Sequence, residues 1–457
     1  MSEEKKQIPK RVLFCGFWQE HHKTALSNHL KKFSYDLVGL VSHHNYLAEH
    51  DPIFISQRGI YRHNTFLDNP GQELPPGKII EQLRDVESTC LKMMDRNYKS
   101  PIKYRRYEFR KRTYLAQLAS AYSILTTHRF DQVLFSLTPH NTFDYIIHHL
   151  AQRLGIKSSF FAQIQVKDSF FHATDIKQIY HQILPALENN PSTDLPEHLE
   201  NEIADRNGTS KPFYMTRANL SWKQIIYRKQ KRILRLHSYT QTIFAIPPYL
   251  SYLTCPKLHA PPKSKYVYFA LHFQPEATTS PMGGIYVDQY FAILMLARSL
   301  PEGVDVVVKE HPRQRMWQRT CEFYSVLKAE KNVKFAHKKV DSLELTRNSL
   351  AVATITGTVG WEAIFNKKPV FIFGNVFYRF LKGVVHVTDQ NSITAAIDQI
   401  ESDKFEYASE QNIRAYLSAI HQVSYTGVVD AEYFRNSRFS KEESTRKLED
   451  VLGTITT

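Results

Sequence analysis

Apolar and polar residues alternate along the chain in blocks typical of buried strands followed by amphipathic helices. In the first half, short apolar runs predict strands at 11–16, 35–42, 132–137 and 156–164. A helical spacing of apolar residues predicts helices at 22–32, 104–127 and 142–154. The region 46–99 is mixed, with Pro and Gly clusters that mark loops. The polar stretch 190–216 is predicted to be an insertion or exposed loop, and 222–236 a basic helix.

The same alternation restarts in the second half, after a proline-rich stretch. Strands are predicted at 265–271, 305–309, 333–336, 350–355, 368–373 and 384–387. Helices are predicted at 286–300, after Pro312, and at 341–348, 359–365 and 393–400. Strands that alternate with helices indicate parallel sheets covered on both faces, so the expected fold class is α/β with two Rossmann-like doubly wound domains facing a cleft.

The prolines at 247, 248, 261 and 262 place the predicted domain boundary, because proline interrupts both helical and strand hydrogen bonding. The expected organisation is a first domain over 1–246, a hinge over 247–264 and a second domain over 265–428. The remaining residues, 429–457, carry a polar helix that we expect to pack back on the first domain.

Composition limits the class of protein. No apolar run reaches the roughly 18 residues that a membrane span needs, and the charged N-terminus lacks the apolar core of a signal peptide, so we expect a cytoplasmic location. The four cysteines are scattered without CxxC spacing, which argues for free thiols and against a zinc site. No other metal-ligand cluster occurs either, so no metal is expected.

The net charge of +14 favours anionic partners. Basic residues gather at Lys99–Arg112 and Lys223–Arg235, interleaved with apolar ones. Solvated helix faces and contact with an anionic membrane both fit this pattern, and peripheral attachment to the inner membrane is one expectation. Nucleic acid is not expected as a partner, because no nucleic-acid-binding module accompanies the basic stretches.

The tip of the predicted strand 305–309 is the first candidate for chemistry. It carries Lys309, Glu310, His311 and Pro312 where a parallel strand would end at a ligand site. A histidine there can donate a hydrogen bond to a phosphate or bind it as a cation, and proline can open a following helix. We therefore expect His311 and Glu310 to act in catalysis and Lys309 and Pro312 to contact substrate.

A second tip follows the strand 350–355. Small and hydroxyl residues there suit a backbone that binds an anion at a helix N-terminus; they are Thr356, Gly357, Thr358 and Gly360. Glu362 is expected in the first helical turn, where it can hold a ribose hydroxyl or complement the helix dipole.

The loop 272–280 supplies a third set of polar groups near the same edge of the sheet: His272, Gln274, Glu276 and Ser280. An acceptor hydroxyl would also need a general base from the first domain. Asp168, Asp175, His140 and Glu20 qualify by residue type, and spacing does not choose between them; Asp168 is taken as the candidate.

Three stretches carry a family resemblance: YVYFALHFQPEATTSPMGG, VVVKEHP and TITGTVGWEAIFNKKPVFIFG. Together they resemble the C-terminal half of bacterial capsule and surface-polysaccharide biosynthesis glycosyltransferases of the GT-B fold. They are similar to the His-Pro-motif transferases that use CMP-activated sialic acid or Kdo. The resemblance implies that His311 contacts the donor phosphate and that Thr356, Gly357 and Thr358 line its phosphate and ribose. The acidic-acidic-Gly motif that supplies the base in sialyltransferase relatives is absent from this sequence.

The resemblance implies a metal-independent glycosyltransferase with a nucleotide-sugar donor, a CMP-ulosonic acid being favoured. The acceptor would be an oligosaccharide or lipid-linked glycan of a capsular or surface polysaccharide, bound by the first domain. The nucleotide-sugar would be a substrate, so no cofactor is expected. Two alternatives stay open, a UDP-sugar 2-epimerase-like enzyme and a non-catalytic scaffold of a polysaccharide assembly complex.

Overall fold

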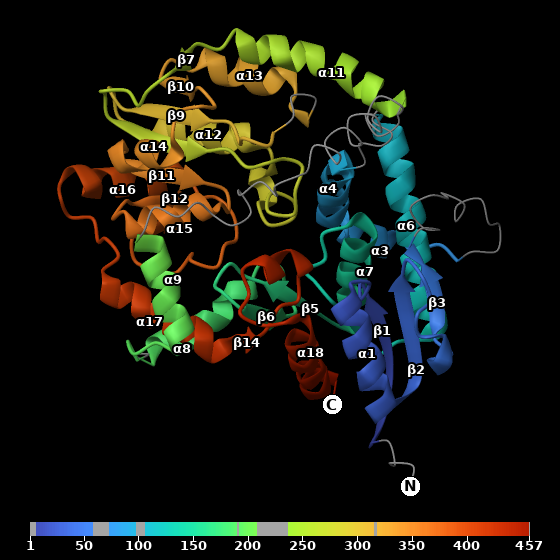
Figure 1. Ribbon diagram of the computed structural model, residues 1–457. Helices are drawn as coiled ribbons and strands as arrows, with labels where there is room; N and C mark the ends of the chain where they lie inside the picture. The colour runs from blue at the N-terminus through green and yellow to red at the C-terminus, as the bar shows by residue number, and fades with distance from the viewer. Residues whose placement is uncertain are drawn as a thin grey trace, which may run out of the picture. The chain divides into compact units, whose positions relative to one another are not determined.

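The computed structural model describes residues 6–57, 73–96, 106–189, 192–207, 236–314 and 318–456. The chain divides into two α/β units (Figure 1). Unit 1 comprises Met1–Met94, Lys103–Ala186 and Ala419–Thr457, and unit 2 comprises Asp95–Ile102 and Leu187–Ser418. The predicted basic helix 222–236 falls outside the described residues except for its last one, as do residues 99–105 of the basic stretch Lys99–Arg112.

Unit 1 is built on a seven-stranded sheet in the order β14-β6-β5-β4-β1-β2-β3. Its strands are β1 (Lys6–Cys15), β2 (Phe33–Ser42), β3 (Ile53–Ser56), β4 (Gln132–Phe135), β5 (Lys157–Gln163), β6 (Ser169–Ala173) and β14 (Tyr425–Thr426). The strands β3, β2, β1, β4 and β5 are parallel, whereas β6 and β14 continue the sheet antiparallel. Val12, Leu13 and Phe14 are fully buried, as expected for a strand covered on both faces.

The helices of unit 1 include α1 (Glu20–Lys32), α3 (Gly77–Gln82), α4 (Arg84–Met93), α6 (Tyr107–His128), α7 (Thr142–Arg153) and α18 (Lys441–Thr456). The last of these returns from the far end of the chain and packs against α1. Its apolar side, with Leu448 and Leu452, joins the same core cluster as Leu26 and Leu30 of α1. His22 Nε2 lies 2.6 Å from the Val429 carbonyl oxygen and fixes the approach to this helix.

Unit 2 contains an entirely parallel sheet in the order β13-β12-β11-β8-β9-β10-β7. Its strands are β7 (Lys257–Leu258), β8 (Tyr266–Ala270), β9 (Asp305–Lys309), β10 (Val333–Ala336), β11 (Ala351–Thr354), β12 (Val370–Ile372) and β13 (Val384–His386). Its helices include α9 (Glu197–Asn207), α11 (Leu236–Leu253), α12 (Gln289–Ser299), α13 (Cys321–Ala329), α14 (Ser342–Asn348), α15 (Thr358–Phe365), α16 (Gln390–Glu401) and most of α17 (Glu410–Val423).

The two doubly wound α/β units confirm the fold class predicted from sequence. Within the mixed region 46–99 lie strand β3 and helices α3 and α4. The stretch 190–216, predicted to be an insertion or exposed loop, holds α9. The helix predicted after Pro312 is α13, which begins at Cys321, whereas Pro312 lies in a turn. The prolines 247 and 248 do not end a helix, since both lie inside α11. Proline's fixed φ is compatible with a helix, and α11 is supported along α13.

Candidate functional site

The strand order of unit 2 locates its ligand crevice. Strand β8 is the first strand of the doubly wound part of the sheet. The next two strands along the chain, β9 and β10, lie on one side of it, and β11, β12 and β13 lie on the other side. In open α/β sheets, ligands bind outside the carboxyl ends of the strands where the order reverses in this way. In unit 2 that point lies between the tips of β8 and β11, and we call it the unit 2 switch point.

His272 joins the two strand tips at the unit 2 switch point. Its Nε2 accepts a hydrogen bond from the backbone N–H of Thr356 at 3.0 Å and lies 3.1 Å from Thr354 Oγ1. Burial, with His311 and Arg319 nearby, lowers the pKa of His272 to about 3. The ring is therefore neutral near pH 7, and its proton is placed on Nδ1 by the bonds to Nε2.

The glycines of the β11 tip are required by the protein's own packing. A Cβ at Gly360 would lie 2.2 Å from Tyr378 Oη, and one at Gly357 would lie 2.6 Å from Thr354 Oγ1. The Tyr378 hydroxyl also donates to the Gly357 carbonyl. Gly357 is the N-cap of α15, whose first turn contains Thr358 and Gly360. The Gly360 N–H donates to the Gly357 carbonyl oxygen at 3.2 Å, and the helix dipole favours an anion at the N-terminus of α15.

Glu310, at the tip of β9, is part of a buried ion pair. Arg319 Nη2 donates to Glu310 Oε1 at 2.9 Å, and both side chains are only 2% exposed. The Tyr324 hydroxyl donates to Glu310 Oε2 at 3.1 Å. Lys309 Nζ donates to Ser342 Oγ at 2.6 Å. These contacts give Glu310 a structural role, in contrast to the catalytic one predicted for it.

Arg319 is the central residue of this network and was not predicted. Besides Glu310 it donates to Gln274 Oε1 at 2.9 Å and to the His272 carbonyl oxygen at 3.0 Å. Gln274 Nε2 in turn donates to the Val287 carbonyl oxygen. The Gln274 side chain therefore holds in place the loop 272–280 that follows β8, which we call the β8 loop. The sequence had predicted substrate contact for this residue.

His311 differs from its neighbours because its side chain is half-buried, while its backbone N–H joins that network by donating to Glu310 Oε1 at 3.0 Å. Its Nδ1 accepts the backbone N–H of Arg313 at 3.2 Å, so the neutral ring carries its proton on Nε2. Burial, followed by the positive charges around it, outweighs Glu310 and lowers the pKa of His311 to about 4. At neutral pH this residue is a neutral N–H donor.

The other predicted contact residues of unit 2 are distributed around these tips. Glu276 is exposed, and its carbonyl oxygen accepts the N–H of buried Ser280 at 3.0 Å. Pro312 is exposed in its turn. Glu362 is half-buried in the second turn of α15, so its predicted place in the first turn was wrong.

Unit 1 has an equivalent reversal of strand order between β1 and β4, which we call the unit 1 switch point. Ser136 Oγ donates to the Gly16 carbonyl oxygen at 2.6 Å and joins the two strand ends. Gly16 has a φ of +77°, which favours glycine. Trp18 follows and is 47% exposed.

Asp144, in the first turn of α7 near this switch point, is a buried carboxylate that the sequence did not single out. Asn141 Nδ2 donates to its Oδ2 at 3.1 Å, and Gln57 Nε2 lies 3.5 Å from its Oδ1. Within the described ranges these amides are its partners, and no cation forms an ion pair with it. Burial raises the pKa of Asp144 to about 6. A carboxylate kept in this environment is suited to accepting a proton near neutral pH.

Asp168, the predicted base, anchors the C-terminal segment. It accepts hydrogen bonds from Ser437 Oγ at 2.5 Å and from the backbone N–H of Arg438 at 3.3 Å. Arg438 Nε also lies 3.3 Å from Asp168 Oδ2, and the carboxylate side chain is fully buried. These contacts give Asp168 a structural role, in contrast to the catalytic one predicted.

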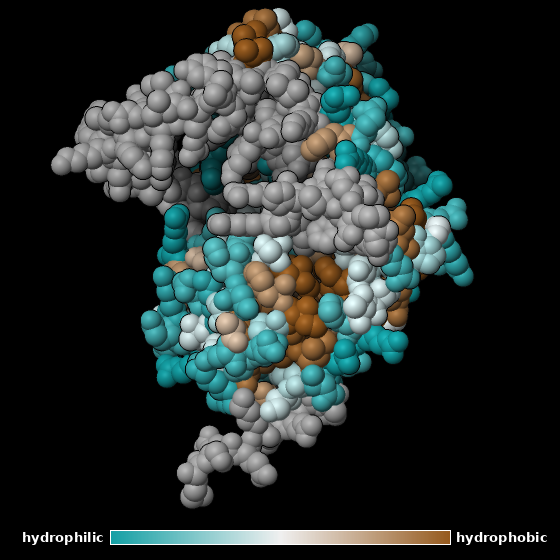
Figure 2. All heavy atoms as spheres, turned by 90° about the vertical axis from the view of Figure 1, so that its right-hand side faces the viewer, coloured by the Kyte–Doolittle hydropathy of each residue, from teal (hydrophilic) through white to brown (hydrophobic). Residues whose placement is uncertain are grey.

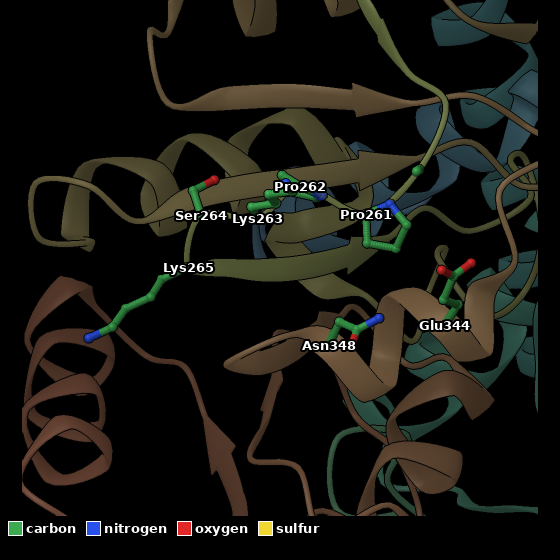
Figure 3. Close-up of a pocket in the computed structure, with 8 residues that line it drawn as sticks. Pro261, Pro262, Lys263, Ser264, Lys265, Glu344 and Asn348 are labelled. Carbon is green, nitrogen blue, oxygen red and sulfur yellow. The ribbon is translucent and has the colours of Figure 1, made fainter.

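A cavity of about 540 Å³ lies at the opposite edge of the unit 2 sheet (Figure 3). It is lined by residues 260–265, which lead into β8, and by Glu344 and Asn348 of α14. Lys265 points away from that helix, and its Nζ lies 2.9 Å from Glu401 Oε1. None of the strand-tip residues lines this cavity.

In the part of the chain that the structure describes, no group of His, Cys, Asp or Glu side chains is arranged to hold a metal ion. None of the described helices combines the length and apolar character needed to cross a membrane.

Comparison with known proteins gives one family. Residues 284–426 match the family model described as capsule polysaccharide biosynthesis protein. This stretch runs from the helix after the β8 loop to β14 and includes the tips of β9 and β11. The match confirms the resemblance to capsule polysaccharide biosynthesis proteins seen in the sequence. No curated protein matches the chain.

Solved structures with a similar arrangement of elements are distant. The beta Kdo 2,7 transferase of KpsC from Thermosulfurimonas dismutans is 13% identical, with a TM-score of 0.31 over 72% of this chain and 88% of that chain. The UDP-GlcNAc 2-epimerase from Neisseria meningitidis bound to UDP-GlcNAc is 13% identical, with a TM-score of 0.25 over 90% of this chain and 99% of that chain.

Proposed function

We propose that the protein is a glycosyltransferase that transfers a sugar from a nucleotide-activated donor to a growing capsular or surface polysaccharide. The observation that carries the proposal is the unit 2 switch point, inside the stretch that matches the capsule family. There, neutral His272 fixes the β11 turn at the start of α15, and His311 offers a neutral N–H donor one strand away. The resemblance in sequence favours a CMP-ulosonic acid as the donor.

In the proposed reaction, the bond between the anomeric carbon and the donor phosphate breaks while a bond to an acceptor oxygen forms. Negative charge develops on the departing nucleotide phosphate. His311 Nε2–H would stabilise it by a hydrogen bond that is already oriented, and the dipole at the N-terminus of α15 would favour the same charge. Because the protein supplies this stabilisation, we propose that neither a metal nor a cofactor is required.

On the acceptor side we propose that Asp144 takes the proton of the attacking hydroxyl. Its pKa of about 6 leaves it ionised at neutral pH yet basic enough to accept a proton. We propose an oligosaccharide or lipid-linked glycan as acceptor, and a reaction at the cytoplasmic side of the inner membrane.

A thermal unfolding panel with CMP, UDP, GDP and their sugars tests the donor assignment. A ligand that binds only the folded state stabilises it by about 2.7 kcal/mol at 100 times its Kd. We expect one nucleotide class, with CMP favoured, to raise the unfolding midpoint. The donor identified in this way is then incubated with and without glycan acceptors. Conversion of the donor sugar to an isomer without acceptor would instead identify an epimerase, and binding of no nucleotide would contradict the proposal.

A further inference from the structure

We propose that the outer face of helix α11 binds the surface of an anionic membrane. This helix has 18 residues, Leu236–Leu253, and contains no Asp, Glu, Lys or Arg. Five of its large apolar or aromatic side chains are between 47% and 64% exposed: Ile243, Ile246, Tyr249, Leu250 and Leu253. Apolar side chains are visible at the top of Figure 2, where Figure 1 shows α11.

The exposed side chains form one stripe along the helix. Ile243, Ile246, Leu250 and Leu253 follow one another at intervals of three and four residues, which places them on one face. The opposite side of α11 is directed into unit 2. Tyr252 on that side is buried, and α11 packs there against α13. The helix is therefore apolar on two faces, of which unit 2 covers one.

Basic residues precede α11 in the sequence. The 13 residues just before it, KQIIYRKQKRILR, contain six Lys or Arg and no acidic residue. An apolar stripe that follows a cationic run of sequence matches a bilayer surface, with apolar side chains among the acyl chains and cations at anionic head groups.

Two further observations favour a lipid surface over a second copy of the chain. The chain carries a net charge of +14, so two copies meeting through this region would repel each other. None of the described helices is suited to cross a membrane, so α11 would lie in the interface. The stripe shares no residue with the unit 2 switch point, and the proposal does not depend on the proposed function.

Sedimentation of the full chain with vesicles tests the proposal. One set contains phosphatidylcholine alone, and the other contains phosphatidylcholine with phosphatidylglycerol. We expect binding to the anionic vesicles that weakens as salt is added. The double variant Leu250→Ser/Leu253→Ser should reduce the partition coefficient by about tenfold or more, because two apolar side chains no longer enter the interface.

The matched control is Phe54→Ser, which removes an exposed aromatic side chain from β3 in unit 1. It should bind anionic vesicles like the unchanged protein. Circular dichroism and the unfolding midpoint would establish that both variants are folded. Equal vesicle binding by the double variant and the unchanged protein would overturn the proposal. So would equal binding to neutral vesicles, or a dimer in light scattering that the double variant abolishes.

Discussion

The two switch points use buried polar groups in opposite ways. At the unit 2 switch point the polar groups satisfy one another: His272 is neutral and accepts the Thr356 N–H, and Glu310 is neutralised by Arg319. Near the unit 1 switch point, Asp144 is buried with amide partners and without an ion pair in the described parts of the chain. A buried charge that lacks a counter-charge is costly, so it is expected where function requires it.

The difference separates two chemical tasks. Unit 2 presents N–H donors whose positions are fixed by the network around Arg319, which suits a phosphate. Unit 1 presents a carboxylate with a raised pKa, which suits a proton from a hydroxyl. The comparison supports the proposal that the nucleotide binds to unit 2 and the acceptor to unit 1.

Lowering the pH should produce the largest difference in stability between the two units. In unit 1, burial lowers the pKa to about 4 or below for His21, His29, His148, His149 and His172. In unit 2 it does so for His272 and His311. A histidine that burial keeps neutral makes its full contribution to the free energy of unfolding above its ordinary pKa of 6.5. This contribution is lost as pH falls toward about 4, because the unfolded state then binds a proton that the folded state does not. At pH 5 the loss is at most about 2 kcal/mol per histidine.

Unit 1 should therefore open before unit 2 between pH 7 and pH 5. Asp144 offsets a small part of the loss, because its raised pKa destabilises the fold at neutral pH and this penalty fades below about 6. Limited proteolysis with mapping of the first cleavage sites measures the order. First cleavages within unit 2 at pH 5 would contradict the comparison.

Asp144→Asn should lower kcat by about 10²–10⁴-fold, the usual contribution of a general base. Folding stability should be unchanged or higher, because the substitution removes an uncompensated buried charge. In the unchanged protein kcat/KM should rise with pH around 6, and this limb should be missing from the residual activity of the variant.

The matched control is Asp168→Asn. It should lower stability by about 1–3 kcal/mol, because Ser437 and Arg438 lose a buried charged acceptor, while the folded fraction keeps its turnover. If the two variants exchanged these results, Asp168 would be the base.

Arg319→Met should lower the free energy of unfolding by about 3–5 kcal/mol, because it leaves Glu310 buried without its counter-charge. The double variant Arg319→Met/Glu310→Gln should recover part of this loss. Denaturant unfolding measures both. A single variant as stable as the unchanged protein would mean that the network does not hold the β8 loop.

Gly360→Ala should cost about 1–3 kcal/mol, because the added methyl group would overlap Tyr378 Oη. Gly77→Ala is the control, since a Cβ there meets nothing within 4 Å. Similar unfolding midpoints for the two variants would contradict this account, because they would show that the turn after β11 can accommodate a methyl group at position 360.

The sequence predicted most strands of both sheets, because those strands are apolar runs that end in polar residues, as at 305–311 and 350–358. It missed β3, β6, β7 and β14, and with them the antiparallel edge of the unit 1 sheet. It also found the strand tips of unit 2, since parallel strand ends are recognisable without tertiary contacts. It missed Arg319, which precedes a helix without any periodic signal, and Asp144, which resembles an ordinary acidic residue in a helical first turn. It gave no sign that Asp168 binds the C-terminal segment, because the partners of that residue lie 269 and 270 positions away.

Calorimetric titration of the preferred nucleotide into the unchanged protein, His311→Ala and Asp144→Asn tests the central assignment most directly. A hydrogen bond to a charged group contributes about 1.5–3 kcal/mol, so His311→Ala should weaken binding by about 10- to 150-fold. Asp144→Asn should bind as tightly as the unchanged protein while losing turnover. Unchanged affinity in His311→Ala, or lost affinity in Asp144→Asn, would contradict the assignment of the nucleotide to unit 2.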